Sequence, residues 1–178
     1  MEFNPGNSSI VYAGEYDANG NTASFYRSTD NGVNWSMVTS GLPSSESSRI
    51  QIAVSPNNNS TVYLLIADDN YGLKGVYKST NNGVSFSLTA NSPNILDSGD
   101  GSSSGGQGWY DLAIVVSPTN VNEVYVGGVN MWKSTNGGSS FSKLTNWYND
   151  GSGSATIHAD QHWFEFNSGN LFVGNDGG

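Results

Sequence analysis

The feature that most constrains the fold of this chain is an internal repeat. Residues 28–35 read Ser-Thr-Asp-Asn-Gly-Val-Asn-Trp, and variants of this motif begin at Ser79 and Ser134. The three copies therefore start 51 and then 55 residues apart. A repeat of this length holds about four short strands, which is the content of one β-propeller blade. The repeat thus predicts an all-β fold built from successive blades.

A second repeated motif precedes each copy of the first. It occupies residues 3–12, 54–63 and 116–125, and a shortened copy occupies residues 166–172. Each full copy places Pro and Asn between two apolar runs. Proline presets φ and Asn tolerates left-handed backbone, so the motif predicts a tight turn between the first and second strands of a blade. The Ser-Thr-Asx-x-Gly motif then joins the third strand to the fourth.

These turns divide each repeat into four predicted strands. First strands are predicted at 50–54, 112–116 and 164–166, second strands at 62–66 and 123–127, third strands at 75–79 and 130–134, and fourth strands at 86–89 and 141–145. The sequence therefore predicts a β-propeller of four-stranded antiparallel blades, with about three and a half blades in the chain.

The same divisions predict the organisation of the chain. Residues 1–45 form blade 1, 46–92 blade 2, 93–108 a Gly/Ser-rich loop, 109–146 blade 3, 147–157 a second loop, and 158–178 the start of blade 4. Propeller rings close with about four to eight blades. We therefore expect the remaining blades of a larger chain, or a second copy of this one, to complete the ring. Two copies of three and a half blades would sum to seven.

Composition excludes several classes of function. Six basic against 15 acidic side chains give a net charge of −9, so we expect no nucleic-acid partner. Without Cys, the chain has neither disulfides nor thiolate metal ligands. No apolar run approaches the roughly 18 residues of a membrane helix, so no membrane insertion is expected. Scarce Lys with abundant Ser, Asn and Gly is typical of bacterial secreted or cell-surface proteins, although the chain shows no signal-peptide pattern.

Each copy of the Ser-Thr-Asx-x-Gly motif has the residues of a tight turn. The Asx side chain accepts hydrogen bonds from nearby backbone N–H groups, and Gly adopts a positive φ without steric cost. The aromatic residue that follows is expected to fold beneath the turn and pack against the blade. The positions of this structural motif are Ser28, Asp30, Gly32 and Trp35, then Ser79, Asn81, Gly83 and Phe86, and finally Ser134, Asn136, Gly138 and Phe141.

The motif resembles the Asp-box, or BNR repeat, of sialidases, sortilin-type receptors, photosystem-assembly propellers and xyloglucan-degrading glycoside hydrolases. The resemblance covers nearly the whole chain and implies a β-propeller. In these families the box is a structural element at the edge of the blade, so the resemblance implies a structural role for Asp30. The later copies depart from the pattern, because Asn replaces Asp and Phe replaces Trp. Asparagine still accepts the backbone hydrogen bonds, so the turn is expected to persist without its charge.

The candidate ligand site lies where the first strands begin. In a propeller these strands line the central channel, and their starting ends face the side that carries most ligand sites. Long Gly- and Ser-rich segments at 91–108 and 147–156 lead to that side, and long loops on a rigid frame commonly carry function. The candidate ligand-binding residues are Arg49, Trp109, Tyr110, Asp111, His158, Asp160 and His162.

His158, Asp160 and His162 allow two interpretations. Their spacing of two would place all three on one face of an extended strand, where two imidazoles and a carboxylate can hold a divalent metal. Alternatively, His162 occupies the apolar position that matches Ile50 and Leu112, and is hydrogen-bonded to Asp160. Short His/Asp patterns often arise by chance, so we favour a binding or electrostatic role without a metal or other cofactor.

Trp109 and Tyr110 also allow two interpretations. Aromatic rings beside carboxylates suit a sugar-binding cleft, because rings stack on the CH faces of sugars and carboxylates bind the hydroxyls. On strand alternation, however, Tyr110 shares a face with Leu112, whereas Trp109 shares the other face with Asp111. We therefore expect one of the two rings to belong to the core.

Paired carboxylates decide whether the chain is a glycosidase, since such enzymes use one protonated and one ionised group. Residues 172–178 resemble the segment that carries a catalytic Asp in xyloglucan-active family 74 enzymes. Sialidases need three Arg for the substrate carboxylate, and with Arg27 and Arg49 alone this chain is not expected to act as one. The candidate catalytic residues are Asp111, Asp160 and Asp176.

Together these features favour an extracellular Asp-box propeller module that binds a polysaccharide or a surface protein at the channel mouth. The first alternative is a fragment of a xyloglucanase-like glycoside hydrolase that uses paired Asp carboxylates. The second alternative is a structural interaction platform without a ligand site.

Overall fold

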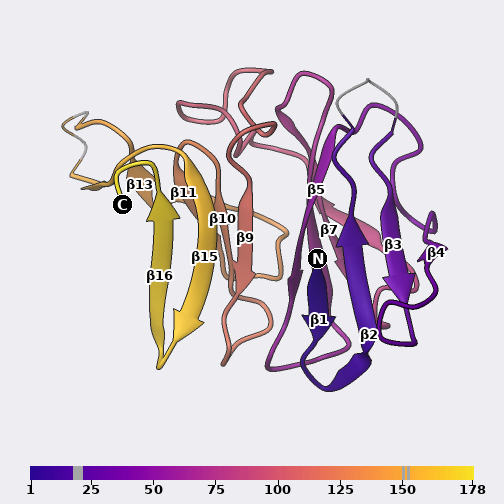
Figure 1. The fold of residues 1–178 in the computed structure, drawn as a ribbon. Coiled ribbons are helices and arrows are strands. Elements are labelled where there is room, and N and C mark those ends of the chain that lie inside the picture. The colour runs from indigo at the N-terminus through magenta and orange to yellow at the C-terminus, as the bar shows by residue number, and fades with distance from the viewer. Residues whose placement is uncertain (18–21, 150, 152) are drawn as a thin grey trace.

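The chain forms an all-β β-propeller of four-stranded antiparallel blades, with three full blades and half of a fourth. A computed structural model describes residues 1–178 except 18–21, 150 and 152, which fall within the predicted first blade and second loop. Figure 1 shows the sheets side by side, from β1 and β2 near the N-terminus to β15 and β16 near the C-terminus. Among the described residues, no helix has the length and apolar character that crossing a membrane requires.

The strands follow one another in each sheet in chain order. The first sheet contains β1 (Glu2–Asn4), β2 (Asn7–Gly14), β3 (Phe25–Ser28) and β4 (Ser36–Met37). The second contains β5 (Arg49–Val54), β6 (Val62–Ala67), β7 (Leu73–Ser79) and β8 (Ser87–Ala90). The third contains β9 (Ala113–Val116), β10 (Val124–Gly127), β11 (Met131–Ser134) and β12 (Ser142–Lys143). Two pairs complete the fold, β13 (Thr145–Asn146) with β14 (Ala155–Thr156), and β15 (Gln161–Asn167) with β16 (Asn170–Asn175).

The predicted strands agree with these bounds to within a few residues, except at the end of the third sheet. There the predicted strand at 141–145 is interrupted at Leu144. The Thr145 hydroxyl accepts a hydrogen bond of 3.0 Å from the Met131 N–H, so a side chain replaces a backbone partner in the ladder. Residues Thr145 and Asn146 then form β13, which pairs in parallel with β14.

The first strands of the sheets lie next to one another. β5 contacts both β1 and β9, and β9 contacts β15. Figure 1 shows β1, β9 and β15 pointing the same way, with long loops beside the ends at which β9 and β15 begin. This arrangement brings the candidate site residues of different blades to one side of the molecule.

The three Ser-Thr-Asx-x-Gly turns share one hydrogen-bond network. In the first copy, the Asp30 carboxylate accepts from the Ser28 hydroxyl at 2.8 Å and from the Asn34 N–H at 2.8 Å. Asn81 and Asn136 accept the equivalent bonds at 2.8–3.1 Å, as the sequence predicts. The backbone and side-chain hydrogen bonds of Asn34 lower the pKa of Asp30 to about 2. Each turn contains a Gly with positive φ, at residues 32, 83 and 138.

The aromatic residues of these turns join successive sheets. Phe86 is buried, and its ring meets Phe25 of the preceding sheet edge-on at 5.0 Å. Phe141 is buried in the same cluster as Tyr63 of the second sheet. Trp35 instead stays 37 % exposed and donates its indole N–H to the Gly32 carbonyl at 2.8 Å. The prediction that each ring packs against the blade thus holds for Phe86 and Phe141, which also contact the preceding sheet, whereas Trp35 remains partly exposed.

The hydrophobic core is accordingly divided into layers between sheets. One cluster joins the first and second sheets, a larger one joins the second and third, and a small one joins the third to β15 and β16. All six residues of β6 are buried, because the second sheet has a neighbour on both faces. Burial between repeats rather than within them is how repeat architectures gain stability.

Candidate functional site

The loop before β9 is held in place by the partly buried side chain of Asn94 and the buried side chain of Asp97. The Asn94 amide accepts from the Leu73 N–H at 2.8 Å and donates to the carbonyls of Ser103 and Gly105 at 2.8 and 2.9 Å. Asp97 is 3 % exposed and accepts from both the N–H and the hydroxyl of Ser103. These bonds connect the loop to the start of β7 and join its two ends.

Arg49 anchors the end of this loop. Its Nη1 donates to the carbonyls of Gly108, Trp109 and Tyr110 at 3.1–3.3 Å. The sequence predicts that Arg49 is a ligand-binding residue. The structure gives it a positioning task, because its Nη1 is committed to three backbone carbonyls of the turn that presents the two aromatic rings.

Trp109 and Tyr110 are both at the surface, with exposed fractions of 50 % and 40 %. The prediction that one of them belongs to the core is wrong. Both lie in a turn in which Gln107 O accepts from the N–H groups of Tyr110 and Asp111 at 2.7 and 3.0 Å. Because β9 begins later, at Ala113, strand alternation does not apply to them.

The two rings belong to a row of four. Tyr71 meets Trp109 at a centroid distance of 6.5 Å, Trp109 meets Tyr110 at 5.4 Å, and Tyr110 meets His162 edge-on at 4.8 Å. We call Tyr71, Trp109, Tyr110 and His162 the aromatic row. Its members come from the connection between β6 and β7, the turn before β9, and β15. Tyr71 carried no signal in the sequence, because its place in the row depends on the packing of two sheets.

Asp111 and Asp160 are linked by one amide. The Gln107 Nε2 group donates to Asp160 Oδ1 at 2.7 Å and to Asp111 Oδ2 at 3.4 Å. Asp111 is fully buried, and among the described residues its Oδ1 has no hydrogen-bond partner. Burial, and then the charge of Asp160, raise the pKa of Asp111 to about 8. Asp111 therefore keeps its proton at neutral pH.

Asp176 has the opposite environment. Its Oδ1 lies 2.7 Å from His162 Nε2, and its Oδ2 accepts from the Tyr110 hydroxyl at 2.9 Å. The hydrogen bond to His162, and then that to Tyr110, lower the pKa of Asp176. The same contact with Asp176 raises the pKa of Tyr110. The site thus combines a protonated buried carboxyl group with an ionised exposed one.

The structure separates His158, Asp160 and His162. β15 begins at Gln161, and Asp160 has a φ of 67°, so the three residues do not lie along one extended strand. Asp160 bonds to Gln107 and His162 to Asp176, which also contradicts the predicted bond between His162 and Asp160. Among the residues that the structure describes, no three His, Cys, Asp or Glu side chains are placed to hold a metal ion.

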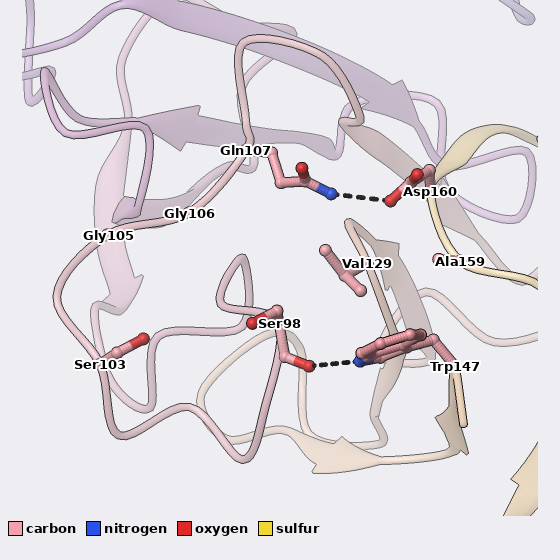
Figure 2. A pocket seen from close by; sticks show the side chains of 9 residues that line it. All are labelled: Ser98, Ser103, Gly105, Gly106, Gln107, Val129, Trp147, Ala159 and Asp160. Atoms are coloured by element: carbon pink, nitrogen blue, oxygen red, sulfur yellow. Dashed lines mark hydrogen bonds between the residues drawn. The ribbon is translucent and has the colours of Figure 1, made fainter. Parts of the chain in front are cut away.

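A pocket of about 470 Å³ lies beside Asp160. Figure 2 shows Gln107 bonded to Asp160 on one side and Trp147 bonded to Ser98 on another, with Val129 between them. The length and the Gly- and Ser-rich composition of residues 91–108 and 147–156 predict that both segments border a site. They do not identify individual residues within these segments. The described lining residues are Ser98, Ser103, Gly105, Gly106, Gln107, Val129, Trp147, Ala159 and Asp160.

Comparison with known proteins supports the architecture. The sequence matches no family model and no curated protein. An ancestral GH74 enzyme aligns with a TM-score of 0.57 at 18 % identity, over 96 % of this chain and 20 % of that one. YCF48 bound to D1 peptide aligns at 0.54 and 10 % identity, over 99 % and 54 % of the two chains. YCF48 from Cyanidioschyzon merolae aligns at 0.52 and 12 % identity, over 96 % and 51 %.

The chain thus spans about a fifth of the GH74 enzyme and about half of each YCF48 protein. At these identities the likeness establishes the β-propeller fold alone.

Proposed function

We propose that this chain binds a neutral glycan along the aromatic row. The observation that carries the proposal is the exposure of adjoining rings beside carboxylates, with Trp109 and Tyr110 both open to solvent. Rings of this kind stack on the CH faces of sugars, while Asp176 and Asp160 accept hydrogen bonds from hydroxyl groups. The hydrogen bonds of Arg49, Asn94 and Asp97 hold the loop and its two rings in place, which lowers the conformational entropy lost on binding.

Charge narrows the class of glycan. The chain has a net charge of −9, and the guanidinium of Arg49 is engaged by backbone carbonyls. Asp160 and Asp176 add negative charge at the site itself. A polysaccharide that carries carboxylates or sulfates would be repelled there, so the proposal concerns uncharged chains.

Trp109→Ala is expected to weaken binding to the best uncharged polysaccharide of an array at least tenfold. The indole is half exposed, so its loss removes a stacking surface while the core stays intact. Affinity electrophoresis or titration calorimetry on the purified chain measures the change.

Trp35→Ala is the matched control, since this indole is also partly exposed but belongs to a structural turn in the first sheet. Equal binding by wild type and Trp109→Ala would contradict the proposal. A wild-type chain that binds no glycan but captures a peptide or a surface protein would favour the protein-ligand alternative. YCF48 in complex with D1 peptide shows a related fold with a peptide ligand.

A second candidate function, glycoside hydrolysis, is favoured by two carboxyl groups that a substrate can reach, those of Asp160 and Asp176. Asp176, with its pKa lowered, has the character of the ionised partner, whereas Asp111 is fully buried and cannot contact a glycosidic oxygen. If the chain cleaves xyloglucan, Asp176→Asn is expected to reduce the release of reducing ends at least a hundredfold while polysaccharide binding persists. Cleavage at the wild-type rate by Asp176→Asn would exclude Asp176 from that role.

We further propose that the chain belongs to an extracellular Asp-box propeller, with the blade boundaries predicted from the repeats. Its Ser, Asn and Gly content and the conserved geometry of the three turns support this assignment. Additional blades, from a longer chain or a second copy, would then complete the ring and cover the exposed ring of Trp35 as Phe86 and Phe141 are covered.

A further inference from the structure

We infer that the pocket beside Asp160 is a second sugar subsite, and that a bound glycan passes over Asp160 from the aromatic row into it. The inference rests on the proposed glycan-binding function and extends it to a surface outside the row. It assigns a binding role to Trp147 and to the loop at 98–107.

The indole of Trp147 is fixed against the loop. Its Nε1 donates to the Ser98 carbonyl at 3.0 Å, and its backbone N–H donates to Asn130 Oδ1 at 2.9 Å. The Asn130 side chain is 1 % exposed and donates to the carbonyls of Ser98 and Gly99. The buried amide of Asn130 thus joins Trp147 to the loop at Ser98 and Gly99, and these two segments form one wall of the pocket. The ring itself remains 46 % exposed, which leaves a surface on which a sugar can stack.

The opposite wall is equally constrained. Gln107 holds Asp160 by the 2.7 Å bond visible in Figure 2. Gln161 is fully buried, and its Nε2 donates to the His158 carbonyl at 2.7 Å, which stabilises the turn at Asp160. Its backbone N–H donates to the Gly128 carbonyl at 2.9 Å. Because both walls are fixed by internal bonds, the pocket exists without a ligand and little ordering is needed on binding.

The lining of the pocket selects for an uncharged polyol. Its volume of about 470 Å³ is within the range of small-molecule sites. It offers an indole, the amide of Gln107 and the carboxylate of Asp160. Asp160 is the one charged side chain among the described lining residues, so an anionic ligand would meet a like charge. A neutral pyranose supplies both the CH face and the hydroxyl donors that these groups can bind.

The pocket and the aromatic row adjoin. Asp160 lines the pocket, and His162, two residues further along, packs edge-on against Tyr110 of the row. Two residues of backbone span at most about 7 Å, so one glycan chain can occupy both surfaces. Asp160 then lies at the junction, with the protonated Asp111 linked to it through Gln107.

The test compares two uncharged probes, cellotriose and cellohexaose, by titration calorimetry. Trp147→Ala is expected to weaken cellohexaose binding about tenfold and to leave cellotriose binding unchanged, because the short probe needs the row alone. Trp109→Ala is expected to weaken both probes, and Trp35→Ala neither. In wild-type protein, the indole N–H resonance of Trp147 should shift with cellohexaose and not with cellotriose, a readout that requires no variant.

Three results would count against the second subsite. If Trp147→Ala binds both probes like wild type while Trp109→Ala weakens both, the pocket is overturned and the proposed function stands. An unmoved Trp147 resonance with saturating cellohexaose leads to the same conclusion. If the wild type binds neither probe nor any polysaccharide of an array, the subsite and the proposed function fail together.

Discussion

Asp111→Asn is expected to stabilise the fold increasingly as the pH rises, by about 4 kcal/mol more at pH 9 than at pH 5. The carboxyl group of Asp111 is fully buried, and burial beside Asp160 raises its pKa from 3.8 to about 8. The amide of Asn has nearly the same shape and never ionises. Urea unfolding of both proteins at pH 5, 7 and 9 gives the two free energies of unfolding directly.

The sign follows from where the proton is bound. Below about pH 4, Asp111 is protonated in both states, so it causes no penalty. Between pH 4 and pH 8 the unfolded chain releases this proton while the folded chain retains it. The free energy of unfolding of the wild type therefore falls by about 1.4 kcal/mol per pH unit over this window. Above pH 8 the folded state also ionises and the loss is complete.

An exposed carboxylate provides the control. Asp100 is at the surface, and hydrogen bonds from Ser102 lower its pKa. Asp100→Asn is therefore expected to show no stabilisation at alkaline pH. Parallel pH profiles for wild type and Asp111→Asn would show that Asp111 is already ionised at neutral pH and would contradict its raised pKa.

Phe86→Ala is expected to destabilise the protein by about 3–5 kcal/mol, whereas Trp35→Ala should cost about 1 kcal/mol. The two residues occupy the same position of their repeats. Phe86 is 5 % exposed and packs against Phe25 of the preceding sheet, whereas Trp35 is 37 % exposed. Deleting the buried ring leaves a cavity between two sheets, and deleting the exposed one does not. Urea denaturation at a single protein concentration compares the three chains.

Phe141→Ala should resemble Phe86→Ala, because Phe141 is buried against the second sheet in the same manner. Equal costs for Trp35→Ala and Phe86→Ala would contradict the assignment of Trp35 to an open face. They would indicate that another blade covers this ring in solution, and a dependence of the Trp35→Ala cost on protein concentration would identify that blade as part of a second copy.

The aromatic row and the carboxyl groups are predictable from the sequence only in part. Strand alternation predicts that one of Trp109 and Tyr110 belongs to the core, but both are exposed, because they lie in a turn stabilised by the Gln107 carbonyl. The spacing of Asp160 and His162 predicts that they lie on one face of the same strand. A left-handed residue at 160 instead directs them to different partners.

The sequence by itself determined the blades and their turns. The Ser, Asx and Gly positions of each turn lie within five consecutive residues, so the hydrogen bonds among them are local and recur in all three copies. Only the tertiary structure decided which of the candidate site residues contact one another. Gln107 meets Asp160 across 53 residues, and Tyr110 meets Asp176 across 66. Contacts of this kind depend on how each sheet packs against the next, which is a property of the assembled arc and leaves no local pattern in the chain.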